Sequence, residues 1–142
     1  YVLTELFDYN NVEQMISECT HDIQNGIIDI FVLYDKDTLT SICAVSRIND
    51  TTIEIKNLAT YPEYQNKGYA SLLLDFLCRK YKENFKTLIL GTGENEKTLN
   101  FYKKRGFIET HRIKDFFIDN YSHPIFENGK QLIDMIYLEK NL

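Results

Sequence analysis

The chain has few cysteines and prolines, and it has no tryptophan. Its three cysteines, Cys19, Cys43 and Cys78, are an odd number without metal-ligand spacing, so we expect reduced thiols in a cytoplasmic protein and no metal. No apolar run reaches the roughly 18–20 residues that cross a bilayer, and no signal peptide is recognisable. Repeats and Gly/Ser/Pro-rich linkers are also missing, and we therefore expect one domain over residues 1–142.

Basic residues and the common phosphate-binding motifs are also scarce. The chain has 16 Lys and Arg against 21 Asp and Glu, a net charge of −5, which disfavours nucleic-acid binding and is compatible with a cationic amine substrate. No Gly-Lys-Ser/Thr triplet is present, so a P-loop is excluded. The one Gly-x-Gly, Gly91-Thr92-Gly93, lacks the third glycine of a dinucleotide-binding fingerprint.

What the sequence does contain is a strand, a glycine-containing turn and a helix in immediate succession. Residues 52–60 alternate and are rich in β-branched side chains, which predicts a strand. After the turn Gln65-Asn66-Lys67-Gly68-Tyr69-Ala70, apolar residues recur at helical spacing through Tyr81. The first turn of a helix has unpaired N–H groups at its positive end, so this segment predicts a phosphate-binding site.

The remaining pattern predicts a mixed α/β (α+β) fold in which strands and helices interleave after an antiparallel start. Hairpin turns are expected at residues 35–37 and 49–50. We expect strands near 2–7, 29–34, 40–48, 52–60, 87–91, 107–117 and 132–138, and helices near 11–25, 67–84 and 96–105.

The turn and its flanks resemble the GCN5-related N-acetyltransferase (GNAT) superfamily. The turn fits the acyl-CoA pyrophosphate loop, Gln/Arg-x-x-Gly-x-Gly/Ala, and residues 58–64 resemble the family's lead-in to it. Further matches are the strand 88–93, Asn95, Phe101-Tyr102 and Arg105-Gly106-Phe107, while Thr98 stands where the family usually has alanine. Residues 115–135 resemble one bacterial subgroup. The resemblance implies a mostly antiparallel sheet of about seven strands with helices on both faces.

It also implies an acetyl-CoA-dependent N-acetyltransferase, with acetyl-CoA as co-substrate and a primary amine of a small molecule or peptide as acceptor. A backbone N–H at a bulge near residues 58–60 would polarise the thioester carbonyl. Asn95 would contact pantetheine or cap the following helix, and these roles do not exclude each other. The residues expected at the cofactor are Leu58, Ala59, Thr60, Gln65, Asn66, Lys67, Gly68, Tyr69, Ala70, Ser71 and Asn95.

Tyr102 aligns with the family tyrosine that protonates the departing CoA sulfur, although an aromatic at this position could equally be core. Glu54 is the candidate general base, with ordered water or a purely solvated side chain as alternatives. His111 and His123 are weaker candidates. Cys43 and Cys78 have no neighbouring histidine in the sequence, so direct attack by the amine is favoured over a covalent intermediate.

The acceptor pocket is expected around Asp115, Phe116, Phe117, Tyr121 and Glu127, because a carboxylate with aromatics suits an ammonium group. The alternative would be plain packing of Phe116 and Phe117. Two other functions stay open: a catalytically silent acyl-CoA-binding or regulatory module of the same fold, and a nucleotide-binding protein using Gly91-Thr92-Gly93. We expect no nucleic-acid or membrane partner, and either a monomer or a homodimer.

Overall fold

The computed structural model describes residue 26 and residues 28–142, so the strand and helix expected within residues 1–25 lie outside the described part. Alternating, β-branched stretches form the strands, and apolar residues at helical spacing form the two longer helices. In chain order the elements are β1 (Ile28–Asp35), β2 (Thr38–Arg47), β3 (Thr52–Thr60), η1 (Pro62–Tyr64), α2 (Tyr69–Tyr81), β4 (Thr87–Gly93), α3 (Glu96–Lys103), β5 (Ile108–Ile113), α4 (Phe116–Asp119), β6 (Phe126–Glu127), β7 (Lys130–Gln131) and β8 (Met135–Asn141).

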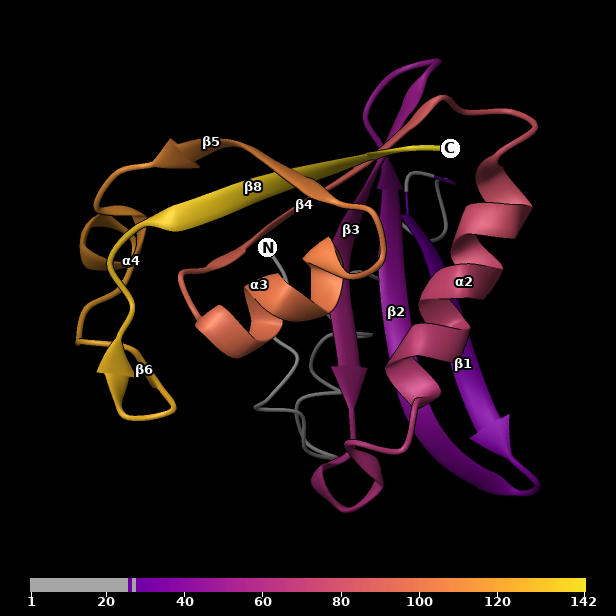
Figure 1. Ribbon diagram of the computed structural model, residues 1–142, viewed down its shortest axis with the longest axis horizontal. Helices are drawn as coiled ribbons and strands as arrows, with labels where there is room; N and C mark the ends of the chain where they lie inside the picture. Colours follow the sequence, from indigo (N-terminus) through magenta and orange to yellow (C-terminus); the bar gives the residue numbers. More distant parts are fainter. Residues whose placement is uncertain (1–25, 27) are drawn as a thin grey trace.

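Six of these strands form one mixed sheet in the order β1-β2-β3-β4-β8-β5, and β6 pairs with β7 in a separate hairpin (Figure 1). All neighbours in the six-stranded sheet are antiparallel except β3 and β4, which run parallel. The expected mostly antiparallel sheet with helices is therefore confirmed, with a slightly different number of strands among the described residues.

The parallel pair β3–β4 separates along its length. The strands pair from Thr52 with Thr87 to Ile55 with Leu90, and no pairing continues beyond that point. Figure 1 shows them diverging towards the carboxyl ends of both strands. At the same place β3 has a bulge against β2, because Val45 faces Ile55 whereas Ala44 faces Asn57, which leaves Lys56 as the extra residue. The bulge thus lies just before the expected residues 58–60.

The two sheet faces are covered differently. On one face, the apolar stripes of α2 and α3 pack on alternate residues of β3, β4 and β8, and this makes the main core. On the other face, the one-turn helix α4 packs through Phe117 against Met135 and Tyr137 of β8. No described helix is long and apolar enough to cross a bilayer.

Several boundaries differ from the sequence prediction, and three of them have local backbone reasons. The predicted helix 67–84 is α2, which begins only at Tyr69 because Asn66 and Gly68 both have positive φ. The predicted strand 107–117 ends at Ile113, and Asp115, with φ 57, begins α4 instead. The predicted strand 132–138 starts later, at Met135, because residues 126–131 form the β6–β7 hairpin.

That hairpin had a sequence signal of its own. Its two-residue loop is Asn128-Gly129, with φ angles of 51° and 76°, as a type I′ turn requires. An Asn-Gly pair between short extended segments is a strong hairpin signal, and it was overlooked in the sequence.

Candidate functional site

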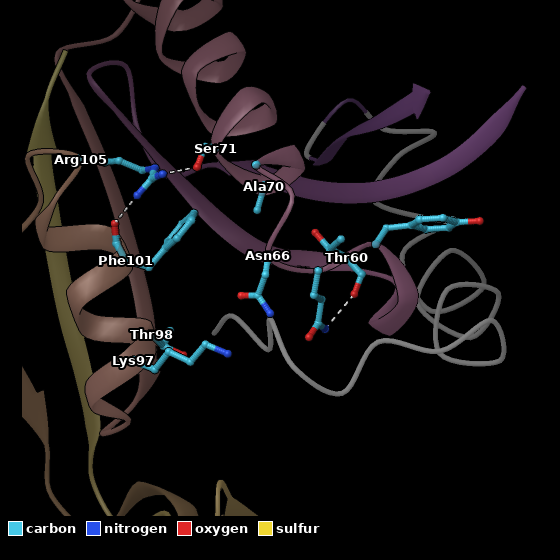
Figure 2. A pocket seen from close by; sticks show the side chains of 11 residues that line it. Thr60, Asn66, Ala70, Ser71, Lys97, Thr98, Phe101 and Arg105 are labelled. Atoms are coloured by element: carbon cyan, nitrogen blue, oxygen red, sulfur yellow. Dashed lines mark hydrogen bonds between the residues drawn. The ribbon is translucent and has the colours of Figure 1, made fainter. Parts of the chain in front are cut away.

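A cleft of about 360 Å³ lies between the turn before α2 and the exposed side of α3. Its volume is within the range of small-molecule sites. Figure 2 shows residues of the turn on one wall and α3 side chains on the other. The lining residues are Thr60, Tyr64, Gln65, Asn66, Gly68, Ala70, Ser71, Lys97, Thr98, Phe101 and Arg105.

The turn places backbone donors along this cleft. Gln65 ties the start of this turn to the end of β3, since its Nε2 donates to the Thr60 carbonyl oxygen at 3.1 Å. Gly68 caps α2 with φ 88, a conformation that L side chains rarely adopt, and it offers no capping side chain. The N–H groups of Tyr69, Ala70 and Ser71 belong to the first helical turn and have no carbonyl ahead of them in the helix. Such donors suit a phosphate.

Tyr102, the candidate acid, is completely buried on the opposite side of α3, among the residues of the main core. Phe101 and Phe107 pack edge-on against its ring, at 5.1 and 5.4 Å between centroids. Its hydroxyl group is a buried polar atom with no hydrogen-bond partner in the described part of the chain. Burial raises the pKa of Tyr102 well above 10.0, so the hydroxyl keeps its proton.

Glu54, the candidate base, lies on the other face of the sheet. It stands between Ile53 and Ile55, whose side chains are in the main core, so alternation along β3 directs it away from Tyr102. Glu54 is 4% exposed, and the Lys56 Nζ donates to its Oε1 at 2.6 Å. Lys56 therefore engages one of the two oxygens of this carboxylate. Its charge also raises the pKa of Tyr137, after the larger effect of burial.

Asn95 caps α3, as one of the two expected roles requires. Its Oδ1 accepts from the N–H groups of Lys97 and Thr98 at 3.0 and 3.4 Å. Its Nδ2 donates to Glu127 Oε2 at 3.2 Å, and both residues are buried. The helix cap is confirmed, and Asn95 also ties α3 to the β6–β7 hairpin. Glu127, one of the residues expected at the acceptor pocket, is thus a hydrogen-bond partner of Asn95.

Those acceptor residues form a packed cluster. Phe117 is 1% exposed, packs edge-on against Phe116 at 5.2 Å and stacks on Tyr121 at 5.8 Å. The Asp115 N–H donates to Asp134 Oδ1 at 2.9 Å, which fixes the start of α4. The structure brings Phe116, Phe117 and Tyr121 together by ring packing, and their role at an acceptor stays a prediction.

The other predicted residues divide into cleft residues and residues directed elsewhere. Leu58 and Ala59 are buried in β3. Lys67 lies over the Tyr64 ring, with its Nζ 5.9 Å from the centroid, and the Tyr69 hydroxyl donates to Asp35. His111 stacks on Tyr137 at 4.7 Å, and His123 is exposed. Six of the predicted cofactor residues line the cleft: Thr60, Gln65, Asn66, Gly68, Ala70 and Ser71.

Gly91-Thr92-Gly93 lies inside β4 and forms no turn. A Cβ at Gly91 would be 2.9 Å from the Tyr137 ring, and one at Gly93 would be 2.8 Å from the Leu132 side chain. These glycines are explained by close packing within the sheet, which removes the basis for the nucleotide-binding alternative.

The α3 wall was missed from the sequence. Lys97 and Phe101 are four residues apart and so share one face of α3, next to Thr98, and Arg105 continues this spacing just past the end of the helix. This spacing of basic and aromatic residues was readable. It was missed because the family pattern directs attention to Tyr102, on the opposite side of the same helix.

Known proteins share this architecture. The family model described as an acetyltransferase (GNAT) domain matches residues 26–109, and the chain therefore belongs to the GNAT acetyltransferase family. The Bacillus subtilis (strain 168) protein YvbK, an uncharacterized N-acetyltransferase, is 32% identical over 116 residues, which are 80% of this chain and 75% of that protein.

Two solved structures extend the similarity to three dimensions. A GNAT family acetyltransferase from Elizabethkingia anophelis with acetyl-CoA bound has a TM-score of 0.78 and 33% identity, over 87% of this chain and 82% of that one. A Bacillus subtilis acetyltransferase in complex with CoA has a TM-score of 0.79 and 29% identity, over 91% and 83% of the two chains.

Proposed function

We propose that the protein is an acetyl-CoA-dependent N-acetyltransferase that acetylates a primary amine of a small molecule or peptide by direct attack. One observation carries this proposal: the unpaired hydroxyl of Tyr102 is buried in the core cluster that contains Ile55 and Leu90, the last paired residues of β3 and β4. A buried hydroxyl without a partner costs free energy, about 1–3 kcal/mol. Retaining it there fits a role towards a ligand that enters where the strands separate.

The residues of the cleft fit CoA. Backbone N–H groups from Asn66 to Ser71 would hold the pyrophosphate, and the unpaired edges of β3 and β4 beyond Ile55 and Leu90 would hold the pantetheine arm. Bound acetyl-CoA supplies an activated thioester, whose acetyl group goes to the amine while CoA leaves as the thiol. The same CoA or acetyl-CoA is present in the two similar solved structures.

Tyr102 would donate the proton of its hydroxyl to the departing sulfur. Its raised pKa keeps the hydroxyl protonated at any physiological pH, so the donor is always present. The attacking amine must lose a proton on the opposite sheet face, either to Glu54 or to ordered water. Cys43, buried next to Tyr102, stays a thiol because burial raises its pKa, and this favours direct attack.

The ion pair between Lys56 and Glu54 favours a second candidate, a catalytically silent acyl-CoA-binding module, because it engages a carboxylate oxygen of the main candidate base. An amine panel separates the two functions. The purified protein is first titrated by calorimetry with acetyl-CoA, CoA, ATP and NAD. It is then incubated with acetyl-CoA and diamines, amino acids, aminoglycosides or lysine peptides, while free thiol is recorded.

We expect binding of both CoA species, none of ATP or NAD, and amine-dependent thiol release with at least one acceptor class. Binding without any thiol release above the rate of buffer hydrolysis would favour the silent module. Absence of CoA binding would reject both functions.

A further inference from the structure

Arg105 differs from Arg47 and Arg112 in having no carboxylate partner among the described residues. Arg47 pairs with Asp29, and Arg112 pairs with Glu94 and Asp134. Arg105 forms no ion pair with any carboxylate in the described part of the chain, and it is the arginine that lines the cleft. A half-buried guanidinium without a counter-charge is well placed to receive an anion.

The guanidinium of Arg105 is held in one orientation (Figure 2). Its Nη1 donates to the Phe101 carbonyl oxygen at 3.0 Å, and its Nη2 donates to the Ser71 hydroxyl. The Phe101 ring lies 4.1 Å from the guanidinium carbon and so covers one face of the group. These two bonds use two of the five N–H groups of an arginine, and the others have no partner among the described residues.

Its position relative to the turn selects the kind of anion. The bond to Ser71 puts the guanidinium beside the third residue of α2, next to the N–H groups proposed for the pyrophosphate. Those backbone donors would serve the pyrophosphate. The adenosine of CoA has a further phosphate group, the 3′-phosphate, which is separated from the pyrophosphate by a ribose and has about −1.5 to −2 charges at neutral pH, as other phosphate monoesters do.

We propose that Arg105 binds the 3′-phosphate of CoA, with Ser71 and Phe101 as positioning residues, and that the protein thereby distinguishes CoA from dephospho-CoA. This inference rests on the proposed function, because it concerns the same cleft. Arg105 acts here in ligand specificity and takes no part in proton transfer.

The test is calorimetric titration of the wild type, Arg105→Gln and Lys104→Gln with CoA and with dephospho-CoA. Lys104 is the matched control, since it is the neighbouring residue, carries the same charge, is exposed and does not line the cleft. We expect the wild type and Lys104→Gln to prefer CoA by about tenfold or more, the size of a charge-assisted bidentate contact. In Arg105→Gln the preference should fall to about twofold or less, with the Kd of dephospho-CoA unchanged.

Two further measurements keep the outcome interpretable. Arg105→Lys retains the charge and loses the planar fork, so its preference should be intermediate. The preference of the wild type should also shrink as salt rises from about 50 to 500 mM, because screening weakens an exposed ion pair.

Equal wild-type affinity for CoA and dephospho-CoA would overturn the inference and leave the proposed function intact. An equal loss of both ligands in Arg105→Gln would also overturn it and assign Arg105 to the pyrophosphate or to the fold. Failure of the wild type to bind either ligand would instead reject the proposed function. Because the wild-type preference requires no substitution, a variant that fails to fold does not prevent the test.

Discussion

The two sides of the opening between β3 and β4 present different chemical groups. On the α2–α3 side, backbone N–H groups and one oriented arginine line an open cleft. On the other side, Phe117 and Tyr121 stack on each other, and Glu54 is paired with Lys56. The first side offers donors to a ligand, whereas on the second side the aromatic rings pack on each other and the Glu54 carboxylate has a lysine partner.

This difference has a physical consequence for specificity. A cofactor bound by backbone donors can be accommodated by many sequences, because the turn needs only the permitted φ angles and small side chains. An acceptor site made of side chains changes with each substitution. The proposed cofactor site therefore depends mainly on backbone conformation, while an acceptor site depends on the identity of its side chains.

Gly68 offers the strongest way to break the cofactor side. A Cβ there would meet no atom within 4 Å, so space allows a side chain, and asparagine and aspartate tolerate positive φ better than most residues. Gly68→Asp should weaken CoA binding by roughly 100-fold or more, since it places a carboxylate at the phosphate site. Gly68→Asn, its uncharged match, should bind CoA within about tenfold of wild type. Calorimetry measures both, and equal losses would show that backbone strain is responsible.

Tyr102→Phe tests the residue proposed to act at the opening itself. Turnover should fall about 10–100-fold with unchanged CoA affinity, as for loss of one acid catalyst. Because the hydroxyl is buried and unpaired, its removal should leave the free energy of unfolding unchanged or raise it by about 1 kcal/mol.

Tyr81→Phe is the matched control for this experiment. Its hydroxyl donates to Asp29 Oδ2 at 2.7 Å, so its removal should lower the free energy of unfolding by about 1 kcal/mol while turnover stays at the wild-type level. Denaturant titration and steady-state kinetics on both variants give the comparison. A Tyr102→Phe variant that is less stable and fully active would identify Tyr102 as a core residue.

Glu54→Gln sharpens the contrast on the acceptor side. If Glu54 accepts the amine proton, kcat/KM for the acceptor should fall about tenfold at neutral pH. The loss should diminish as the pH is raised towards the pKa of the amine, because more of the acceptor is then already deprotonated. The pH profile of kcat/KM measures this, with Lys56→Gln as the control for breaking the ion pair alone. A loss independent of pH and shared by both variants would indicate that the ion pair is structural.

The sequence allowed prediction of the parts of this site that depend on local backbone pattern. Strand β3 has the predicted bounds, because alternation and two flanking turns define it. The turn at Asn66 and Gly68 was recognisable because few residue types tolerate positive φ.

Features that depend on contacts between distant residues were not predictable. The bond from Arg105 to Ser71 joins residues 34 positions apart, and the bulge of β3 against β2 gives no residue signature. The end of β5 at Ile113 depends on Asp115, whose N–H donates to Asp134, the residue just before β8. Each of these required the tertiary structure.

Substitution of Asn95 is expected to have the smallest effect of these tests. Asn95 joins the start of α3, which borders the cleft, to Glu127 of the β6–β7 hairpin. Asn95→Ala removes both the cap and the bond to Glu127, and should lower the free energy of unfolding by about 1–2 kcal/mol. Asn95→Ser keeps a capping oxygen and loses only the bond to Glu127, so about half of that loss should be recovered.

CoA affinity of both Asn95 variants should stay within about twofold of wild type, because the side chain of Asn95 is already engaged by Lys97, Thr98 and Glu127. Denaturant titration gives the stabilities and calorimetry gives the affinities. A drop in affinity larger than the drop in stability explains would show that the amide exchanges these partners for pantetheine. Asn95 would then belong to the cofactor side, and the β6–β7 hairpin that it contacts would have to be counted with that side.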